Sequence, residues 1–140
     1  MPLVRISVSS STTGEQRSAI AAAVYEAMRE TIDIPEGDRF IVFSTHDKSD
    51  LFVDQHFMGM QRTDRYTLVH IFLSRGRSVE KKQALYACLA ARLHDAAQIP
   101  ADDVMIVLTE NNPEDWSFGK GQAQFVLNPP SWMRTAEKGN

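Results

Sequence analysis

The sequence predicts an α/β fold (of the α+β type) in which two β-α-β units form a four-stranded mixed sheet with two helices on one face. The first observation is an internal repeat: Ile34-Pro35 returns as Ile99-Pro100, and the two halves align at a constant offset of 65 residues without a gap. The second is that each half reads strand, helix, strand in its apolar pattern. The third is size, because 140 residues with 43% hydrophobic content suit one domain with a real core.

The first unit, residues 2–45, is predicted to contain a strand at about 3–9, a helix at about 14–31 and a strand at about 39–45. Its first strand alternates apolar and polar positions, and its helix carries an apolar residue at every fourth position. The residues that form these patterns are Val4, Ile6, Val8, Ile20, Val24 and Met28, followed by Ile41-Val42-Phe43 in the second strand.

The second unit, residues 67–110, repeats this order with a strand at about 67–73, a helix at about 79–97 and a strand at about 104–110. In each unit a helical crossover joins two strands, so we expect those strands to pair in parallel with a right-handed connection. The matching apolar residues are Val69, Ile71, Leu73, Leu85, Leu89 and Leu93, followed by Ile106-Val107-Leu108.

The rest of the single domain expected over 1–140 is less regular. Residues 46–66 predict a loop, with a short hairpin as one alternative, around the apolar patch Leu51-Phe52-Val53. The C-terminal segment, 111–140, begins with a turn-rich stretch. Its tail from Asn128 is expected to be mobile or docked on a neighbouring molecule.

One face of the predicted sheet has no helix to cover it. Both helices lie on the same side, and Leu3, Leu68 and Phe72 fall on the other. These side chains also need burial, so we expect a homo-oligomer that packs the open faces together.

Composition excludes several classes of partner. A formal net charge of −3 gives no reason to expect nucleic acid or an anionic membrane surface. No apolar run approaches the ~18 residues of a membrane span. No signal peptide pattern precedes the first strand, and the lone Cys88 cannot form an internal disulfide, so the cytoplasm is the expected compartment.

Four polar groups are expected at one edge of the sheet. Removal of Met1 would make Pro2 a secondary amine, able to act as a base or a proton donor. Pro2 and Asp38 stand at the starts of two strands that run parallel to each other, so both lie at the same edge of the sheet. If the two units pair antiparallel, the third strand runs the other way and ends at that edge, just before Arg75 and Arg77. Two guanidinium groups suit the bidentate binding of a carboxylate.

Each group also has a plain structural alternative. Proline is tolerated at the first residue of a strand. Asp38 has a repeat partner, Asp103, so it can also serve a turn. Arg75-Gly76-Arg77 can be a solvated turn, although Ser10 and Thr12 hold the equivalent positions of the first unit. The histidines at 46, 56, 70 and 94 show no metal-ligand spacing, and no nucleotide-binding motif is present.

Nearly the whole chain, from Pro2 to about Leu127, resembles the tautomerase superfamily, and within it the malonate semialdehyde decarboxylases. The resemblance rests on Pro2, the Pro-Glu-x-Asp-Arg stretch at 35–39 and Ser74-Arg75-x-Arg77. Further matching segments are Asp103-Val104-Met105, Glu110-Asn111, Asp115-Trp116-Ser117-Phe118-Gly119 and Ala123-Gln124-Phe125.

The resemblance implies a fold like that of macrophage migration inhibitory factor, a homotrimer, and a small carboxylate substrate, with no metal or organic cofactor. Pro2 would be the cationic acid that polarises the substrate carbonyl, or the amine of an imine, acting with Asp38. Arg75 and Arg77 would bind the substrate carboxylate. The apolar wall of the site would be formed by Trp116, Phe118 and Phe125.

The leading hypothesis is therefore a cofactor-independent decarboxylase of a small 3-oxo acid, with malonate semialdehyde as the first candidate. One alternative is a keto-enol tautomerase of phenylpyruvate-like 2-oxo acids, with neutral Pro2 as the base. Another is a non-catalytic binding module on the same scaffold. Residues 14–31 contain no histidine, which argues against the related cis-3-chloroacrylate dehalogenases. Lys120 and Gln122 interrupt the final block where the decarboxylases are expected to have a bulky apolar and a basic residue.

Overall fold

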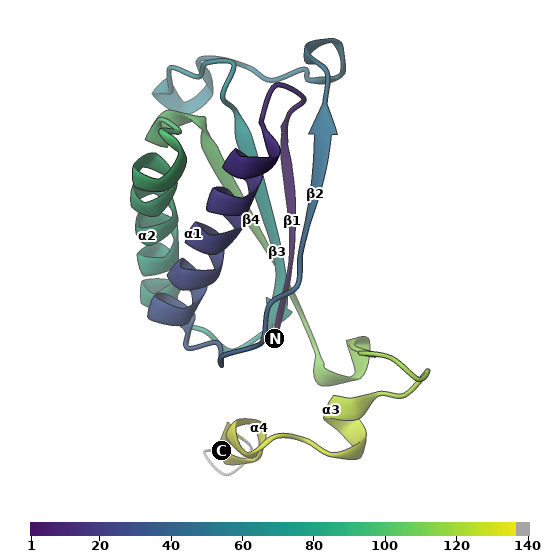
Figure 1. Cartoon of the computed structure of the whole chain (residues 1–140). Coiled ribbons are helices and arrows are strands. Elements are labelled where there is room, and N and C mark those ends of the chain that lie inside the picture. Colours follow the sequence, from purple (N-terminus) through teal and green to yellow (C-terminus); the bar gives the residue numbers. More distant parts are fainter. Residues whose placement is uncertain (137–140) are drawn as a thin grey trace.

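Four strands form one mixed sheet with the order β2-β1-β3-β4. The computed structural model describes residues 1–136, so the last four residues of the predicted C-terminal segment, 137–140, lie outside the described residues. Figure 1 shows both long helices, α1 and α2, on the same side of the sheet. The predicted fold class is confirmed. The strands are β1 (Pro2–Ser9), β2 (Ile41–His46), β3 (Thr67–Ser74) and β4 (Val104–Asn111).

The strand directions follow from the duplication. β1 pairs in parallel with β2, and β3 pairs in parallel with β4. The two units meet at the central pair, where β1 runs antiparallel to β3 and Ile6 lies opposite Val69. The opposite ends of the sheet are therefore built from equivalent parts of the two units.

The long helices begin and end in the same way. α1 (Gly14–Ile32) has Thr13 as its N-cap in a capping box with Gln16, and α2 (Val79–Ala97) is capped by the Ser78 side chain. Asp33 and Gln98, which follow these helices at the 65-residue offset, both take the left-handed conformation. Such a residue ends a helix because it redirects the chain, so that backbone N–H groups at the helix end can bond to the last carbonyl groups.

The core lies between the helices and one face of the sheet. Alternate residues of β1 and β3 are buried there, against the four-residue stripes of α1 and α2. The fully buried members from these stripes are Ile20, Val24, Met28, Leu85, Leu89 and Leu93. The periodicity of the sequence therefore located the core correctly.

The other sheet face is open. Leu3, Leu68 and Phe72 are only half-buried on it. Met105 is 42% exposed and Val107 is 38% exposed on the same face of the edge strand β4. An apolar surface of this kind on a sheet is typical of an interface between molecules.

The loop between the units contains no strand, so the hairpin alternative for residues 46–66 is wrong. Two 3₁₀ helices, Lys48–Asp50 and Phe57–Gly59, occupy this segment instead. The Asp54 carboxylate accepts the backbone N–H groups of His56 and Phe57, both at 2.8 Å. This local side-chain bonding competes with strand pairing.

The C-terminal segment turns back beneath the end of the sheet where the chain begins (Figure 1). It contains a 3₁₀ helix at Pro113–Asp115 and two short helices, α3 (Gln124–Leu127) and α4 (Ser131–Ala136). The expectation that the tail from Asn128 is mobile or docked on a neighbour stays a prediction, and the tail also makes a contact within its own chain. The ring of Trp132 lies 5.9 Å from that of Phe125 in the same chain. None of the helices within residues 1–136 combines the length and apolar character that a membrane span requires.

Candidate active site

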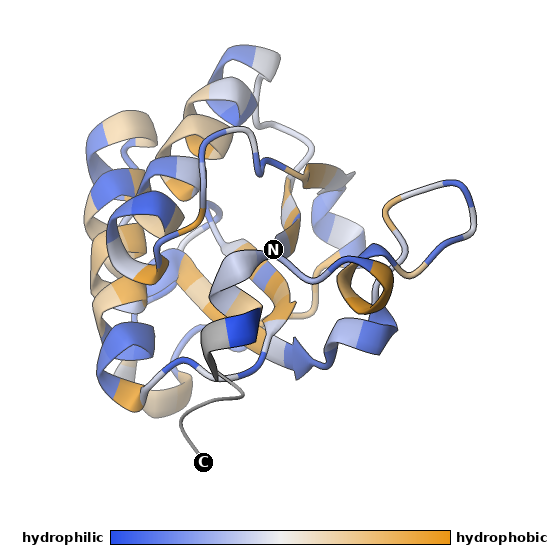
Figure 2. Ribbon diagram, turned by 90° about the horizontal axis from the view of Figure 1, so that it is seen from below, coloured by the Kyte–Doolittle hydropathy of each residue, from blue (hydrophilic) through white to orange (hydrophobic). Residues whose placement is uncertain are grey.

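The topology brings four of the predicted side chains to one end of the sheet. β1 begins at Pro2, which is buried and pairs with Leu73 near the end of the antiparallel strand β3. Asp38 lies shortly before β2, which runs parallel to β1. Arg75 and Arg77 follow the end of β3. Figure 2 looks at this end of the molecule, with the amino terminus at the centre of the view.

A tight turn carries Asp38. The N–H of Asp38 donates to the Pro35 carbonyl at 3.2 Å. Gly37, within the turn, has a φ of +84°, which glycine adopts without steric cost. The Gly37 N–H donates to the hydroxyl of Tyr25 on α1 at 3.0 Å. Helix α1 therefore helps to fix the turn that presents the carboxylate.

An amine and a carboxylate face each other at this end. The amino group of Met1 lies 3.5 Å from Asp38 Oδ2, and both side chains are only 10% exposed. Burial raises the pKa of Asp38, against the opposing effects of the Met1 amine and Arg77. Burial likewise lowers the pKa of the Met1 amine, against the effect of Asp38. Groups whose pKa values are shifted in this way are candidates for proton transfer.

One oxygen of Asp38 is still available. Asp38 Oδ1 is buried and has no hydrogen-bond partner among residues 1–136. A buried acceptor without a partner is costly in a folded protein, and such groups occur often at functional sites. This oxygen is therefore placed to accept a hydrogen bond from a substrate, a water or a repositioned amine.

The two arginines differ in how they are held. Arg77 donates from Nη1 to the Ser74 carbonyl at 2.9 Å and from Nη2 to the Ile32 carbonyl at 3.5 Å. Burial lowers its pKa, although Asp33, Glu110 and Asp38 act in the opposite direction. Arg77 is thus a partly buried cation that is fixed on backbone oxygens.

Arg75 is exposed, and only its backbone is anchored. Its N–H donates to the Asn111 carbonyl at 3.0 Å, which extends the pairing of β3 with β4 by one residue. Its guanidinium forms no hydrogen bond or ion pair in the part of the chain that the structure describes, although its charge acts on Glu110. The pair therefore combines one fixed and one available guanidinium.

The predicted aromatic residues form a continuous row. Trp116 stacks on Phe118 with ring centres 5.6 Å apart, and Phe118 meets Phe125 edge-on at 4.7 Å. Trp132 continues the row beyond Phe125. The indole N–H of Trp116 donates to Asn111 Oδ1 at 2.8 Å, which ties the row to the end of β4. Edge-on and offset ring contacts of this kind stabilise a rigid wall.

A pocket of about 360 Å³ lies between Asp38 and this aromatic row. Of the predicted site residues, Asp38, Phe118 and Phe125 line it, while Pro2, Arg75, Arg77 and Trp116 do not. Met1 occupies the lining where the chain begins. The lining residues that the sequence interpretation missed are Pro35, Gly37, Phe40, Pro130 and Trp132.

Three of these missed residues carried a signal and two did not. Pro35, Gly37 and Phe40 lie close to the candidate carboxylate Asp38 in the sequence. Pro130 and Trp132 come from the tail, where no repeat or periodicity indicates a position. Lys120 is exposed in the turn closed by the bridge between Gly119 and Gln122, and it does not line the pocket.

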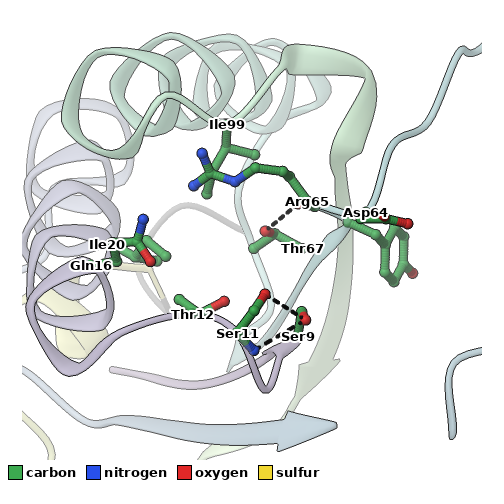
Figure 3. Close-up of a pocket in the computed structure, with 10 residues that line it drawn as sticks. Ser9, Ser11, Thr12, Gln16, Ile20, Asp64, Arg65, Thr67 and Ile99 are labelled. Atoms are coloured by element: carbon green, nitrogen blue, oxygen red, sulfur yellow. Dashed lines mark hydrogen bonds between the residues drawn. The ribbon is translucent and has the colours of Figure 1, made fainter. Parts of the chain in front are cut away.

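A second cavity, of about 260 Å³, lies at the opposite end of the sheet (Figure 3). The 65-residue offset makes Asp103 the counterpart of Asp38 at that end. Asp103 is fully buried, and its carboxylate accepts the Thr63 N–H at 2.6 Å and also the Thr63 hydroxyl. Both oxygens of Asp103 are therefore occupied within the fold, unlike those of Asp38.

The remaining positions at the second end carry hydroxyl groups. Thr67 is the counterpart of Pro2, and its hydroxyl donates to the Arg65 carbonyl at 3.0 Å. Thr12 stands at the position that corresponds to Arg77, and it lines the cavity together with Thr67. The duplication thus produces two similar ends, of which one combines a chain terminus, a partly unpaired carboxylate and two arginines.

Over residues 1–136, no group of three or more His, Cys, Asp and Glu side chains is arranged to hold a metal ion. His70 is used on the open sheet face, where Nε2 lies 2.8 Å from the Thr109 hydroxyl.

Comparisons with known proteins agree with this architecture. Two models of the family described as "Tautomerase enzyme" match the chain, one over residues 38–119 and one over residues 2–59. The "Probable tautomerase YusQ" of Bacillus subtilis (strain 168) is 36% identical over 126 residues, which cover 90% of this chain and 99% of that protein.

Solved structures are similar over most of the chain. The FG41 malonate semialdehyde decarboxylase inhibited by 3-bromopropiolate is 40% identical, with a TM-score of 0.86 over 92% of this chain and 98% of that one. The fused 4-OT, solved as a wild-type symmetric trimer, is 21% identical, with a TM-score of 0.75 over 90% of this chain and 98% of that one. At 21% identity, the similarity to the fused 4-OT shows a shared fold and nothing further.

Proposed function

The chain belongs to the tautomerase superfamily of enzymes, and from this premise we propose that it is a cofactor-independent decarboxylase that converts malonate semialdehyde to acetaldehyde and CO2. One observation carries the proposal: the amino terminus, the buried carboxylate of Asp38 and two arginines meet at one end of the sheet, beside an aromatic pocket. Similarity to the FG41 decarboxylase at 40% identity supports the choice of reaction.

Pro2 would act as the general acid once Met1 is removed. The Met1 amine already lies next to Asp38, and Pro2 is the adjacent residue at the start of β1. Removal of Met1 transfers the chain terminus to Pro2 and leaves space in the pocket that Met1 now lines. Asp38 would hold the resulting secondary ammonium, or a water, through its unpartnered Oδ1.

Decarboxylation requires a group that accepts the electron pair of the broken carbon–carbon bond. When the bond between the carboxylate carbon and the methylene carbon breaks, its electron pair moves toward the aldehyde carbonyl. A proton from the Pro2 ammonium to the carbonyl oxygen would give an enol, which then becomes acetaldehyde. A cation placed at the developing oxyanion lowers the barrier because it stabilises charge that appears only in the transition state.

The two guanidiniums would bind the substrate carboxylate until it leaves as CO2. Arg77 would provide a fixed charge, and Arg75 a guanidinium without other partners. The aromatic wall of Trp116, Phe118 and Phe125 would shield the carboxylate from water. Loss of solvent destabilises a charged carboxylate relative to neutral CO2 and therefore favours decarboxylation.

The open sheet face supports a homotrimer as the working form. Its apolar side chains on β1, β3 and β4 have no cover in a single chain. The fused 4-OT, which has the same fold, was solved as a symmetric trimer. Burial of this face in a closed ring would remove the exposed apolar surface.

A keto-enol tautomerase of phenylpyruvate-like 2-oxo acids is the second candidate. It is favoured by the lowered pKa of the buried terminal amine, because a neutral Pro2 would act as a base rather than an acid. The similar protein of B. subtilis is also described as a probable tautomerase.

The test uses protein whose mass shows that Met1 has been removed. Malonate semialdehyde is added, and acetaldehyde is followed by proton NMR against the spontaneous rate. We expect acetaldehyde to form well above that rate. Turnover no faster than the spontaneous reaction contradicts the decarboxylase, and phenylpyruvate enol is then the substrate that tests the second candidate.

A further inference from the structure

Glu110, the penultimate residue of β4, is bound through both of its carboxylate oxygens. Oε1 lies 2.5 Å from Nζ of Lys82 on α2, and Oε2 accepts the N–H of Gly76 at 3.3 Å. The Lys82 and Glu110 side chains are 25% and 30% exposed, so the pair is partly shielded from solvent. Glu110 thus connects helix α2 to the turn after β3.

Gly76 is the residue between the two arginines. Its φ is +118°, a conformation that residues with a side chain rarely adopt. No atom lies within 4 Å of the place where a Cβ would stand, so the backbone angle alone requires glycine here. Since the N–H of Arg75 is bonded to Asn111, the last two residues of β4 hold consecutive N–H groups of the turn.

The other half of the chain shows which of these bonds belongs to the general fold. The backbone bond from Arg75 to Asn111 is repeated at the opposite end of the sheet, where the Ser10 N–H donates to the His46 carbonyl at 2.8 Å. The carboxylate bond is not repeated, because the counterpart of Glu110 is the exposed Thr45. The side-chain anchor is therefore an addition at the end that carries the arginines.

The same bonds also keep the Glu110 carboxylate from pairing with the Arg75 guanidinium. A carboxylate near Arg75 would compete with a substrate for its guanidinium. The pKa of Glu110 is lowered chiefly by its hydrogen bond to Lys82, so Glu110 remains ionised. The charge of Arg75 lowers this pKa as well, but among the described residues Arg75 donates no hydrogen bond to Glu110, whose two oxygens are bound by Lys82 and Gly76.

We propose that Glu110, held by Lys82, is a positioning residue that fixes the Arg75–Arg77 turn through the Gly76 N–H and leaves the Arg75 guanidinium open to the substrate carboxylate. The inference rests on the proposed function, because it assumes that Arg75 binds a carboxylate. In this role Glu110 acts through the turn and not through a contact with the substrate.

The experiment measures binding as well as turnover. Malonate is the probe, because it has a carboxylate beside a methylene and no aldehyde to react, and its dissociation constant is measured by calorimetry. Glu110→Ala should weaken binding by about tenfold, while Glu110→Gln should stay within about threefold because its amide oxygen can still accept the Gly76 N–H. Lys82→Met should also weaken binding, since Glu110 is then released to pair with Arg75. Thr45→Ala, the matched control in the other half, should bind as the wild type does.

Steady-state kinetics distinguish a positioning role of Glu110 from a general loss of folded structure. Glu110→Ala should raise KM for malonate semialdehyde with a smaller effect on kcat, and Glu110→Gln should restore KM. Melting temperatures confirm that each variant is folded. Equal malonate binding by the wild type and Glu110→Ala overturns the inference, as does a wild type that binds no malonate. Normal malonate binding and the expected Glu110 effect, combined with no acetaldehyde formation, would contradict the proposed function alone.

Discussion

Arg77 and Arg65 each donate a hydrogen bond to the last residue of one of the two long helices. Arg77 Nη2 lies 3.5 Å from the Ile32 carbonyl, and Arg65 Nη2 lies 2.7 Å from the Ala97 carbonyl. Ile32 and Ala97 end α1 and α2 and are separated by the 65-residue offset. A cation at the last turn of a helix satisfies free carbonyl groups and the negative end of the helix dipole. Arg77 therefore has a structural role that Arg75 lacks.

The two arginines should respond differently to alanine. Arg75→Ala is expected to lower kcat/KM for malonate semialdehyde by about 100-fold or more, because a principal carboxylate ligand is lost. Its free energy of unfolding should stay within about 0.5 kcal/mol of the wild type, since the side chain is exposed. Arg77→Ala should lose activity and also about 1–3 kcal/mol of stability, as the buried carbonyls of Ser74 and Ile32 lose their donor. Steady-state kinetics measure the loss of activity, and urea unfolding measures the loss of stability. A normal kcat/KM for Arg75→Ala would contradict the role of Arg75 in binding the substrate carboxylate.

The two equivalent aspartates provide a second matched pair. Asp103→Asn should destabilise the fold by about 1–3 kcal/mol, because an amide NH2 replaces an acceptor that faces Thr63, while activity per folded molecule is retained. Asp38→Asn should abolish most activity without this loss of stability. Equal activity losses in the two variants would show that Asp38 has no special role.

Asp38 should also make stability depend on pH. Burial raises the pKa of Asp38 in the folded state above the value of 3.8 expected in the unfolded chain. As pH rises, Asp38 therefore ionises first in the unfolded chain, and the free energy of unfolding falls between these two pKa values. Asp38→Asn is therefore expected to be more stable than the wild type at neutral pH, with the difference vanishing below about pH 4. Thermal unfolding at several pH values tests the sign, and a variant that is less stable at neutral pH contradicts it.

The pH dependence of turnover distinguishes the two candidate reactions. Decarboxylation needs cationic Pro2, so kcat/KM should fall as pH rises through the pKa of the Pro2 amine. Burial lowers the pKa of the Met1 amine at this place, and the same burial is expected to lower that of Pro2 once it is the terminus. Tautomerisation, which needs neutral Pro2, should instead accelerate with rising pH. The profile is measured on protein without Met1, and activity that does not change across the titration would contradict both roles.

Charge on the open sheet face should prevent assembly. Val107→Asp places a carboxylate on the exposed face of β4, outside the core, so the chain should fold but remain monomeric. Sedimentation velocity of this variant is compared with that of Glu80→Lys, a charge change on an exposed position of α2. An unchanged sedimentation coefficient for Val107→Asp would show that the face is not the interface.

Most of the fold could be predicted because both periodicities repeat. The predicted ranges for the helices and strands agree with the structure to within about two residues, since apolar spacing reports directly which side of an element is buried. The meeting of Pro2, Asp38 and the arginines at one end also followed, because strand direction alone determines which ends coincide.

The sequence does not reveal what depends on single contacts. The sequence of residues 46–66 allows a hairpin, because nothing in its pattern indicates that the Asp54 carboxylate accepts two backbone N–H groups. Trp132 was missed because its place in the pocket depends on the path of a short tail without a repeat partner. The difference between Arg75 and Arg77 depends on which backbone carbonyls lie within reach, and identical residue types give no sign of it.

The duplication also bears on how such a protein can change. In a pair of separate identical units, every substitution would appear at both ends of the shared sheet. In a single chain each end is encoded by its own residues, so Thr67 and Asp103 can serve folding at one end while Pro2 and Asp38 remain available at the other. The lining of the second cavity is therefore free to acquire mutations, as long as the sheet still forms, without any loss at the end that carries the chain terminus.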